Sequence, residues 1–423
     1  MAQVFKFGGA SVKDAEGVKN LVKIIQLQQD QELLVVISAM GKTTNALEKL
    51  NQAFLDGSEQ VQEIFSEIKS YHQQIIQALF ANPKHPVYDE IANTFVEIEW
   101  ILEDAPHPDP DFNYDQIVSV GELLSTKIVA AYLNECGLAA KWVDARSFIQ
   151  TDNTYREGKV NWEKTKELIQ TSIPKLLKSH IVITQGFIGG TSENFSTTLG
   201  REGSDYSAAI FAHCLQAEKL SIWKDVPGVL NADPKLFPNT QKYEQLSYSE
   251  AIEMTYYGAT VIHPKTIKPL QNAGIPLWVK PFTDPTASGT VITELAGTEP
   301  TSPAIIVKKD QLLVSISSKD LSFITEDHLS EIFSAFANCQ IKINMMQVSA
   351  LSFSVCIDQN ARRFGQLADE LRTQFKVKYN EGLELITIRH FTPELVAELS
   401  KDRRVYLEQL SRNTAQIALQ SIE

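Results

Sequence analysis

The chain has 423 residues, of which 43% are hydrophobic, and its formal net charge is −13 at pH 7. This length predicts two or three domains in a globular protein, and the negative charge argues against non-specific binding to nucleic acid or to an anionic membrane. The cysteines are far apart and lack metal-ligand spacing, so they predict neither a zinc site nor a disulfide framework. We find no signal peptide and no stretch able to span a bilayer, and we expect a cytoplasmic protein without nucleic-acid or membrane partners.

From residue 1 to about 295 the sequence alternates between short apolar runs and helical patterns. We predict strands at Val4–Phe7, Leu33–Ile37, Ala140–Val143, Ile181–Phe187, Leu220–Trp223 and Leu277–Val279. Helices are predicted over Val18–Ile25, Ile117–Leu133 and Pro264–Gly274. Strands separated by such helices predict an α/β fold, with a mainly parallel sheet covered on both faces. The mostly helical stretch 58–104 indicates an insertion without a chemical role.

A linker rich in Pro, Thr and Ser, Leu295–Ala304, predicts a domain boundary. After it, residues 310–381 carry the order strand, helix, strand, strand, helix, strand, which is the ferredoxin-like βαββαβ arrangement. A second, truncated copy follows at 382–423, and the run 304–308 could supply a strand that it lacks. We therefore predict two parts, residues 1–295 and residues 304–423, the latter resembling a sensor module.

Polar stretches that contain glycine follow several predicted strands of the first part. They are Lys6–Gly9, Ser38–Asn45, Gly186–Thr191 continuing into Thr198–Asp205, and Lys224–Val229. Because the carboxyl ends of parallel strands form one edge of a sheet, where ligands bind, these loops together indicate a phosphate-containing ligand. Taken alone, the KFGG stretch favours a tight turn beside a solvated Lys6 over a phosphate site.

Two common nucleotide motifs are missing from these loops. Gly41–Thr43 has the Gly-Lys-Thr end of a P-loop, but the glycine required five positions earlier is Val36. The sequence also lacks a GxGxxG fingerprint, which removes the main argument for a Rossmann cofactor site or a protein-kinase loop.

A series of stretches in order over roughly residues 3–290 resembles the signature series of the aspartate kinases, members of the amino acid kinase superfamily. The stretches are KFGGASV, VVISAMGKTTNAL, SVGELLS, ITQGFIGG, TTLGREGSDYSAA, IWKDVPGV and YGATVIHPKT. The resemblance implies an amino acid kinase-like αβα sandwich followed by paired ACT regulatory units, the second truncated. It also implies ATP- and Mg²⁺-dependent phosphorylation of the β-carboxylate of L-aspartate, the first step towards lysine, threonine, methionine and diaminopimelate.

The implied chemistry agrees with the residue types. A side-chain carboxylate has a pKa near 4 and is ionised at neutral pH, so this nucleophile needs no general base. Catalysis then rests on positioning and on neutralising the phosphate charge. By resemblance, Lys6 would contact the transferring phosphoryl group, Gly8 and Gly9 would donate N–H groups to phosphate oxygens, and Asp205 would orient the catalytic cations. The motifs assign no metal ligands, and His263 is not expected to take part in the chemistry.

The resemblance also implies two sets of binding residues. The aspartate pocket would comprise Ser38, Thr44, Glu122, Arg201 and Ser204, with Arg201 on a substrate carboxylate and Glu122 facing the substrate ammonium. The ATP site would comprise Lys6, Gly8, Gly9, Lys224, Asp225, Leu230, Lys235 and Thr260. Ordinary roles remain open for two of them: Asp205 as a helix N-cap and Glu122 as a surface helix residue.

The sequence departs from the family pattern at two places. Thr260 stands where many relatives have a lysine, and Lys224 or Lys265 could substitute for that cation. In the first ACT-like unit, Asn344 stands where the family's lysine-binding element has an aspartate, which predicts weak or absent feedback by lysine. An amino-acid effector at the ACT region and a homodimer are expected by resemblance. A related kinase acting on another carboxylate and a catalytically silent sensor remain the alternatives.

Overall fold

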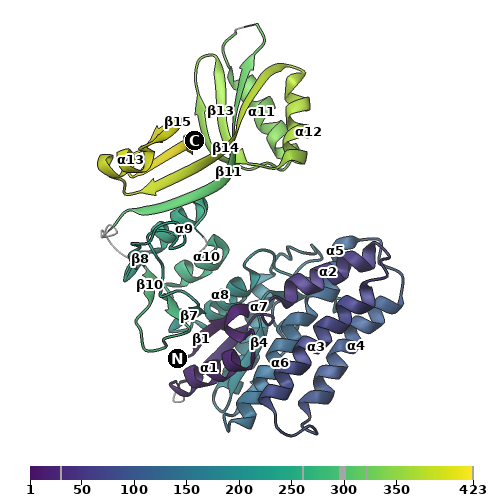
Figure 1. Cartoon of the computed structure of the whole chain (residues 1–423). Helices are drawn as coiled ribbons and strands as arrows, with labels where there is room; N and C mark the ends of the chain where they lie inside the picture. The colour runs from purple at the N-terminus through teal and green to yellow at the C-terminus, as the bar shows by residue number, and fades with distance from the viewer. Residues whose placement is uncertain (29–30, 260–261, 295–301, 321, 422–423) are drawn as a thin grey trace. The chain divides into compact units, whose positions relative to one another are not determined.

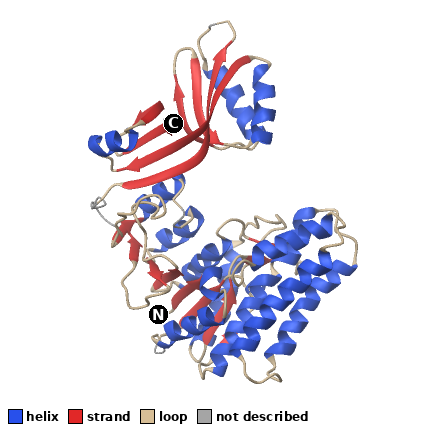
Figure 2. Ribbon diagram, viewed as in Figure 1, coloured by secondary structure: helices blue, strands red, loops and turns tan. Residues whose placement is uncertain are grey.

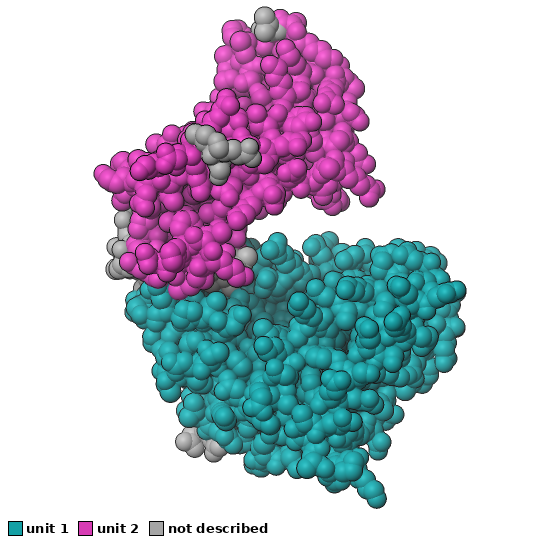
Figure 3. All heavy atoms as spheres, viewed as in Figure 1, with its two compact units in different colours: residues 1–229, 242–252, 261–298 teal, residues 230–241, 253–260, 299–423 magenta. Residues whose placement is uncertain are grey.

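The computed structural model describes residues 1–28, 31–259, 262–294, 302–320 and 322–421. The chain divides into two compact units, distinguished by colour in Figure 3. The first unit comprises residues 1–229, 242–252 and 261–298, and the second comprises residues 230–241, 253–260 and 299–423. The second unit therefore takes two short segments from the part of the sequence assigned to the first domain, and the predicted domain limits stay predictions.

The first unit is built on an eight-stranded, mainly parallel sheet with the order β3-β4-β2-β1-β7-β9-β10-β8 (Figure 1). Its strands are β1 (Gln3–Phe7), β2 (Leu33–Ile37), β3 (Ala140–Trp142), β4 (Ile181–Gln185), β7 (Lys219–Lys224), β8 (Gln245–Ser247), β9 (Leu277–Pro281) and β10 (Thr290–Thr293). Within the described residues of this sheet, the β9–β10 pair is antiparallel and the other strand pairs are parallel. β1 lies between β2 and β7, with Lys6 opposite Val36 and Ile222. The predicted α/β fold class is confirmed.

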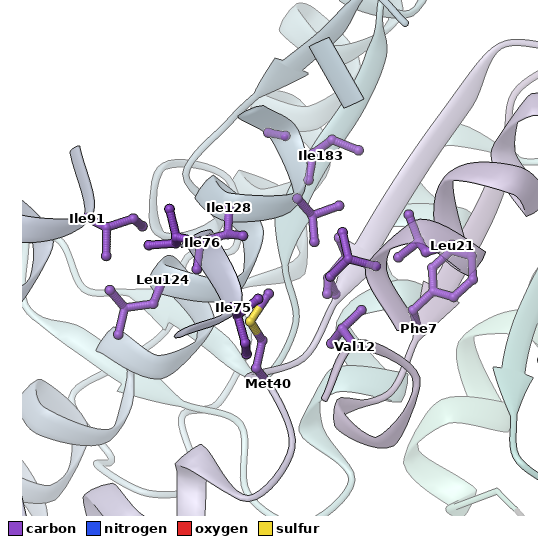
Figure 4. Packing of buried hydrophobic residues seen from close by; sticks show 14 of the residues in the cluster. Phe7, Val12, Leu21, Met40, Ile75, Ile76, Ile91, Leu124, Ile128 and Ile183 are labelled. Carbon is purple, nitrogen blue, oxygen red and sulfur yellow. The ribbon is translucent and has the colours of Figure 1, made fainter. Parts of the chain in front are cut away.

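The two faces of β1 contact different helices. Phe5 and Phe7 belong to a large buried cluster with side chains of α1, α3, α4 and α6. Figure 4 shows Phe7, Leu21, Ile76 and Ile128 within this cluster. Because successive side chains of a strand point to opposite faces, Lys6 projects from the other face, where it meets α8. Continuous apolar strands are expected when both faces of a sheet are covered.

Helices of two groups surround the sheet. Close to it lie α1 (Ala15–Gln26), α7 (Trp162–Leu177), α8 (Gly203–Leu215) and α10 (Pro264–Ala273). α9 (Tyr248–Tyr257) directly follows β8, and its residues from 253 onward are assigned to the second unit. A helical layer, visible beside β4 in Figure 1, contains α2 (Thr43–Leu55), α3 (Val61–Leu79), α4 (Val87–Glu103), α5 (Pro110–Val118) and α6 (Val120–Glu135). The expected helical insertion at 58–104 is therefore present as α3 and α4.

Two expectations about α5 and α6 are wrong. The single helix expected over Ile117–Leu133 is divided, because α5 ends at Val118 and α6 begins at Val120. The stretch Pro110–Glu135 is also long and apolar enough to cross a membrane by length and composition. However, 78% of its most apolar window is buried inside the protein, as is usual for a core helix.

The second unit contains a six-stranded antiparallel sheet with the order β12-β13-β11-β14-β16-β15 (Figure 2). Its strands are β11 (Ala304–Ser318), β12 (Ile343–Val348), β13 (Ser352–Asp358), β14 (Phe375–Arg389), β15 (Arg403–Leu410) and β16 (Thr414–Ser421). Its helices are α11 (Glu326–Asn338), α12 (Ala361–Arg372) and α13 (Pro393–Ser400). This is the arrangement of paired ACT-like units that the sequence predicts.

The two ACT-like repeats share their central strands. β11 and β14 are 15 residues long and pair antiparallel on both sides of an irregularity that begins after Lys308. Residues 304–308 pair with 385–389 of the truncated second repeat, and residues 313–318 pair with 375–380 in the first half of β14. The limit expected between residues 381 and 382 falls inside β14, because one continuous strand serves both repeats.

Candidate active site

A cavity of about 640 Å³ lies at the carboxyl ends of β1 and β2 and the N-terminus of α8. Its lining includes the predicted site residues Lys6, Gly9, Ser38, Thr44, Glu122, Arg201, Ser204 and Asp205. These residues come from stretches that are up to about two hundred positions apart in the sequence, and the parallel sheet brings them together. The functional roles assigned to them stay predictions.

Asp205 is the centre of a buried charged cluster. Its Oδ1 lies 2.6 Å from Lys6 Nζ and its Oδ2 lies 3.5 Å from Lys224 Nζ, while its side chain is only 1% exposed. Burial by itself would raise the pKa of Asp205, but the charges of Lys6 and Lys224 outweigh burial and hold that pKa below its ordinary value. The carboxylate is therefore ionised and keeps two ammonium groups at one point of the cavity wall.

Glu122 lies in the first turn of α6 and is buried, so its alternative as a surface residue is wrong. Burial raises its pKa to about 8, although the backbone N–H of Ala39 and the charge of Lys6 act in the opposite direction. Within the described part of the chain, its Oε2 has no hydrogen-bond partner. A buried carboxyl oxygen without a partner, in the wall of a cavity, is suited to receive a cationic group of a ligand.

The two glycines of KFGG have different surroundings. A Cβ on Gly9 would lie 2.6 Å from the carbonyl oxygen of Ala39, and the N–H of Gly41 donates to the Gly9 carbonyl at 3.0 Å. Gly9 is therefore required for the close approach of the loops that follow β1 and β2. A Cβ on Gly8 would only touch Lys6 Nζ at 3.6 Å, an ordinary contact. Phosphate binding by these N–H groups stays a prediction.

The loop that leads into α8 carries Arg201 and Ser204. Gly200 and Glu202 have φ values of 73° and 55°, so a left-handed turn surrounds the exposed Arg201. A Cβ on Gly186, after β4, would lie 2.6 Å from Ser204 Cβ, which explains the glycine in ITQG. The turn thus presents Arg201 at the cavity while Ser204 packs against the end of β4.

The residues predicted for ATP are only partly assembled around this cavity. Lys224 forms an ion pair with Asp205, which lines the cavity. Asp225 follows β7 and is exposed. Leu230 and the exposed Lys235 belong to segment 230–241 of the second unit. Thr260 lies outside the described residues. His263 is the N-cap of α10 and accepts from the N–H of Lys265 at 3.2 Å, which is a structural role.

Two residues of the cavity wall, Tyr114 and Arg156, were not predicted from the sequence. Tyr114 Oη donates to Glu48 at 2.7 Å, and the Arg156 guanidinium lies 4.1 Å from the centre of the Tyr114 ring. Both side chains and Thr198 line the cavity. Arg156 has no glycine-rich or motif context, so the sequence offered no signal for it. Tyr114 lies just before the SVGELLS stretch, which was the one available indication.

No metal site is evident among residues 1–28, 31–259, 262–294, 302–320 and 322–421. Within these ranges, no group of three or more His, Cys, Asp or Glu side chains is arranged to hold a metal ion.

Comparisons with known proteins show the family. The model of the "Amino acid kinase family" matches residues 1–281. The chain is 30% identical over 394 residues to the lysine-sensitive aspartokinase 3 of Escherichia coli (strain K12), over 91% of this chain and 86% of that protein.

Two crystal structures of E. coli aspartokinase III are also similar, each with a TM-score of 0.83 and 27% identity. The structure with aspartate and ADP (R-state) matches over 99% of this chain and 96% of that chain. The structure with lysine and aspartate (T-state) matches over 98% and 95%. The chain belongs to the amino acid kinase family and, within it, to the aspartokinases.

Proposed function

We propose that this protein catalyses the ATP-dependent phosphorylation of L-aspartate. An oxygen of the substrate β-carboxylate attacks the γ-phosphorus of ATP, the bond from that phosphorus to the β,γ-bridging oxygen breaks, and the products are 4-phospho-L-aspartate and ADP. This reaction would be the entry step of lysine, threonine and methionine synthesis. The observation that carries the proposal is one cavity lined by Lys6 and Asp205 of the lysine cluster and by the buried Glu122, whose Oε2 has no hydrogen-bond partner among the described residues.

The lysine cluster suits the phosphoryl group. Lys6 and Lys224 together bring two positive charges, and Asp205 supplies a single negative charge between them. The three groups therefore carry a net positive charge that can offset repulsion between the attacking carboxylate and the phosphates. Asp205 also removes the freedom of both long side chains, so that little reorganisation is needed when the phosphoryl group moves.

Glu122 and Arg201 suit the amino acid. The carboxyl group of Glu122 would pair with the substrate ammonium, which removes the cost of its unpartnered oxygen. Arg201 would bind a substrate carboxylate with its planar, two-pronged guanidinium. Ser38, Thr44 and Ser204 line the same cavity and offer hydroxyl groups to the remaining oxygens.

Mg²⁺ would enter the site with the nucleotide. Mg²⁺ prefers oxygen ligands and usually binds through substrate phosphates and one or two carboxylates, so it needs no cage of protein ligands. We propose that MgATP is the true phosphoryl donor and that the exposed Asp225 lies on the nucleotide side.

The ACT-like region would bind an amino-acid effector, and its exposed edge strands would join two copies of the chain in a cytoplasmic homodimer. Free lysine is expected to be a poor effector. The Asn344 amide donates to Gln311 at 2.9 Å and Asp358 at 2.8 Å, and its oxygen accepts from Lys308 at 2.8 Å. Asn344 thus lacks the charge of a carboxylate, and both its polar atoms already have partners.

A substrate panel tests the proposed function. ADP release is measured with MgATP and aspartate, glutamate or carbamate, and each reaction is repeated with lysine and threonine. We expect turnover with aspartate alone. Turnover only with another carboxylate would assign a related kinase, whereas ATP binding without any turnover would indicate a catalytically silent sensor.

A further inference from the structure

Asp115 is a buried carboxylate outside every motif that the proposed function uses. It lies in α5, its side chain has no exposed surface, and it accepts three hydrogen bonds from two other segments. The backbone N–H of Arg156 and that of Thr198 both donate to Oδ2 at 2.9 Å. The Thr198 hydroxyl donates to Oδ1 at 2.7 Å. One side chain thus joins the segment around Arg156 to the end of β6 (Ser196–Thr198).

Both of these segments reach the catalytic cavity. Thr198 and Arg156 line it, and Thr198 is followed by Leu199, Gly200 and the predicted substrate ligand Arg201. The segments also touch directly, because the N–H of Gly158 donates to the Thr198 carbonyl at 2.8 Å. A Cβ on Gly200 would lie 3.3 Å from the Arg156 carbonyl oxygen. A shift of either segment would therefore move the turn that carries Arg201.

α5 also holds the Arg156 side chain. Its guanidinium lies over the Tyr114 ring, and its Nη1 lies 3.4 Å from Asp111. The backbone of Arg156 has a φ of 66°, a conformation that non-glycine residues adopt only when their surroundings hold them there. Asp115 supplies the hydrogen bond to that residue's N–H, so the backbone and the side chain of Arg156 are both held by α5.

We propose that Asp115 is a positioning residue that sets Arg201 and Arg156 at the cavity for the two carboxylates of the substrate, with Arg156 as a second binding cation. The inference rests on the proposed function, because it assumes that a dicarboxylic amino acid binds there. Two arginines on one wall would favour a substrate with two carboxylates over one with a single carboxylate. Burial raises the pKa of Asp115 to about 6, so this group is ionised in an assay at pH 8.

The test compares Asp115→Ala with Asp115→Asn in the full-length protein at pH 8. Alanine removes all three hydrogen bonds, so the N–H groups of Arg156 and Thr198 lose their acceptor. Asparagine can keep them, because its amide oxygen accepts from both N–H groups and its NH₂ donates to the Thr198 hydroxyl. We expect Asp115→Ala to raise the KM for aspartate roughly 10- to 100-fold, with kcat and the KM for ATP nearly unchanged, and Asp115→Asn to restore most of the affinity.

Arg156→Met provides a second test if Asp115→Ala does not fold. The Arg156 side chain is 51% exposed, so its replacement should leave the protein folded. The substitution should raise the KM for aspartate at least about fivefold and leave kcat nearly unchanged. Arg363→Met is the matched control: Arg363 is also exposed and donates to the Gln340 carbonyl at 2.9 Å in the ACT-like region, and its loss should change neither constant.

The proposal is overturned if Asp115→Asn raises the KM for aspartate as much as Asp115→Ala does. It is also overturned if Asp115→Ala raises the KM values for ATP and aspartate together, or if Arg156→Met leaves both constants unchanged like the control. Failure of the proposed function would be recognised separately, since the wild-type protein would then not phosphorylate aspartate at all.

Discussion

Glu122 gives the sharpest prediction because its protonation should change when substrate binds. Burial raises the pKa of this carboxyl to about 8, so at pH 7 roughly 90% of the empty sites hold a protonated Glu122. A substrate ammonium beside the group favours its charged form and lowers the pKa. Binding of aspartate should therefore release up to about 0.9 proton per site at pH 7 and at most about 0.1 proton at pH 9.

Isothermal titration calorimetry measures this release. Aspartate is titrated into the free protein at pH 7 in buffers with different ionisation enthalpies, and the slope of observed heat against ionisation enthalpy gives the number of protons. Glu122→Gln should release none, and it should bind aspartate roughly 10- to 100-fold more weakly, since a charge-assisted hydrogen bond contributes about 1.5–3 kcal/mol. Glu163→Gln, which changes an exposed carboxylate in the first turn of α7, should behave like the wild type.

Thermal unfolding of the free protein provides an independent check. The folded pKa of Glu122 lies above the unfolded value of 4.5, so its contribution to stability is fully present below pH 4.5 and is lost as the pH rises towards 8. Glu122→Gln has no charge to bury and should not lose that contribution. Its Tm at pH 8 should equal or exceed that of the wild type. Equal proton release from wild type and Glu122→Gln, or no release by the wild type at pH 7, would refute the reasoning.

Three further predictions concern catalysis and regulation. Lys6→Met should lower kcat by at least about 100-fold, because one cation of the Lys6–Asp205–Lys224 cluster is lost at the phosphoryl group. Steady-state kinetics with saturating substrates measures this effect, and an unchanged kcat would contradict the role of Lys6. Arg201→Ala should chiefly raise the KM for aspartate while the KM for ATP stays within about twofold, which initial rates over a grid of both substrates can separate. Lysine at micromolar concentration should leave turnover nearly unchanged, because Asn344 carries no charge and its amide already donates hydrogen bonds to Gln311 and Asp358. Clear inhibition of turnover by micromolar lysine would contradict this prediction.

The sequence by itself predicted the layout of the site through its strands. The buried strands are mostly apolar, and the polar stretch at the end of each lies at the carboxyl edge of a parallel sheet. Lys6 and Asp205 could therefore be assigned to one site although they are far apart in the chain, and their side chains are 2.6 Å apart in the structure. Gly9 is required at the same edge of the sheet, because a Cβ at this position would clash where the loops after β1 and β2 meet.

The protonation of Glu122 and the roles of Asp115 and Arg156 depended on tertiary structure alone. A carboxylate in a helical pattern has the same local sequence whether it is solvated or buried, and only packing of α6 against neighbouring segments removes Glu122 from water. The apolar stretch Pro110–Glu135 shows the same limit, because its composition suits a membrane but its surroundings are the protein core. Local sequence determines which elements form and what chemistry they carry, while burial and long-range contacts decide which groups are charged and which are held in place.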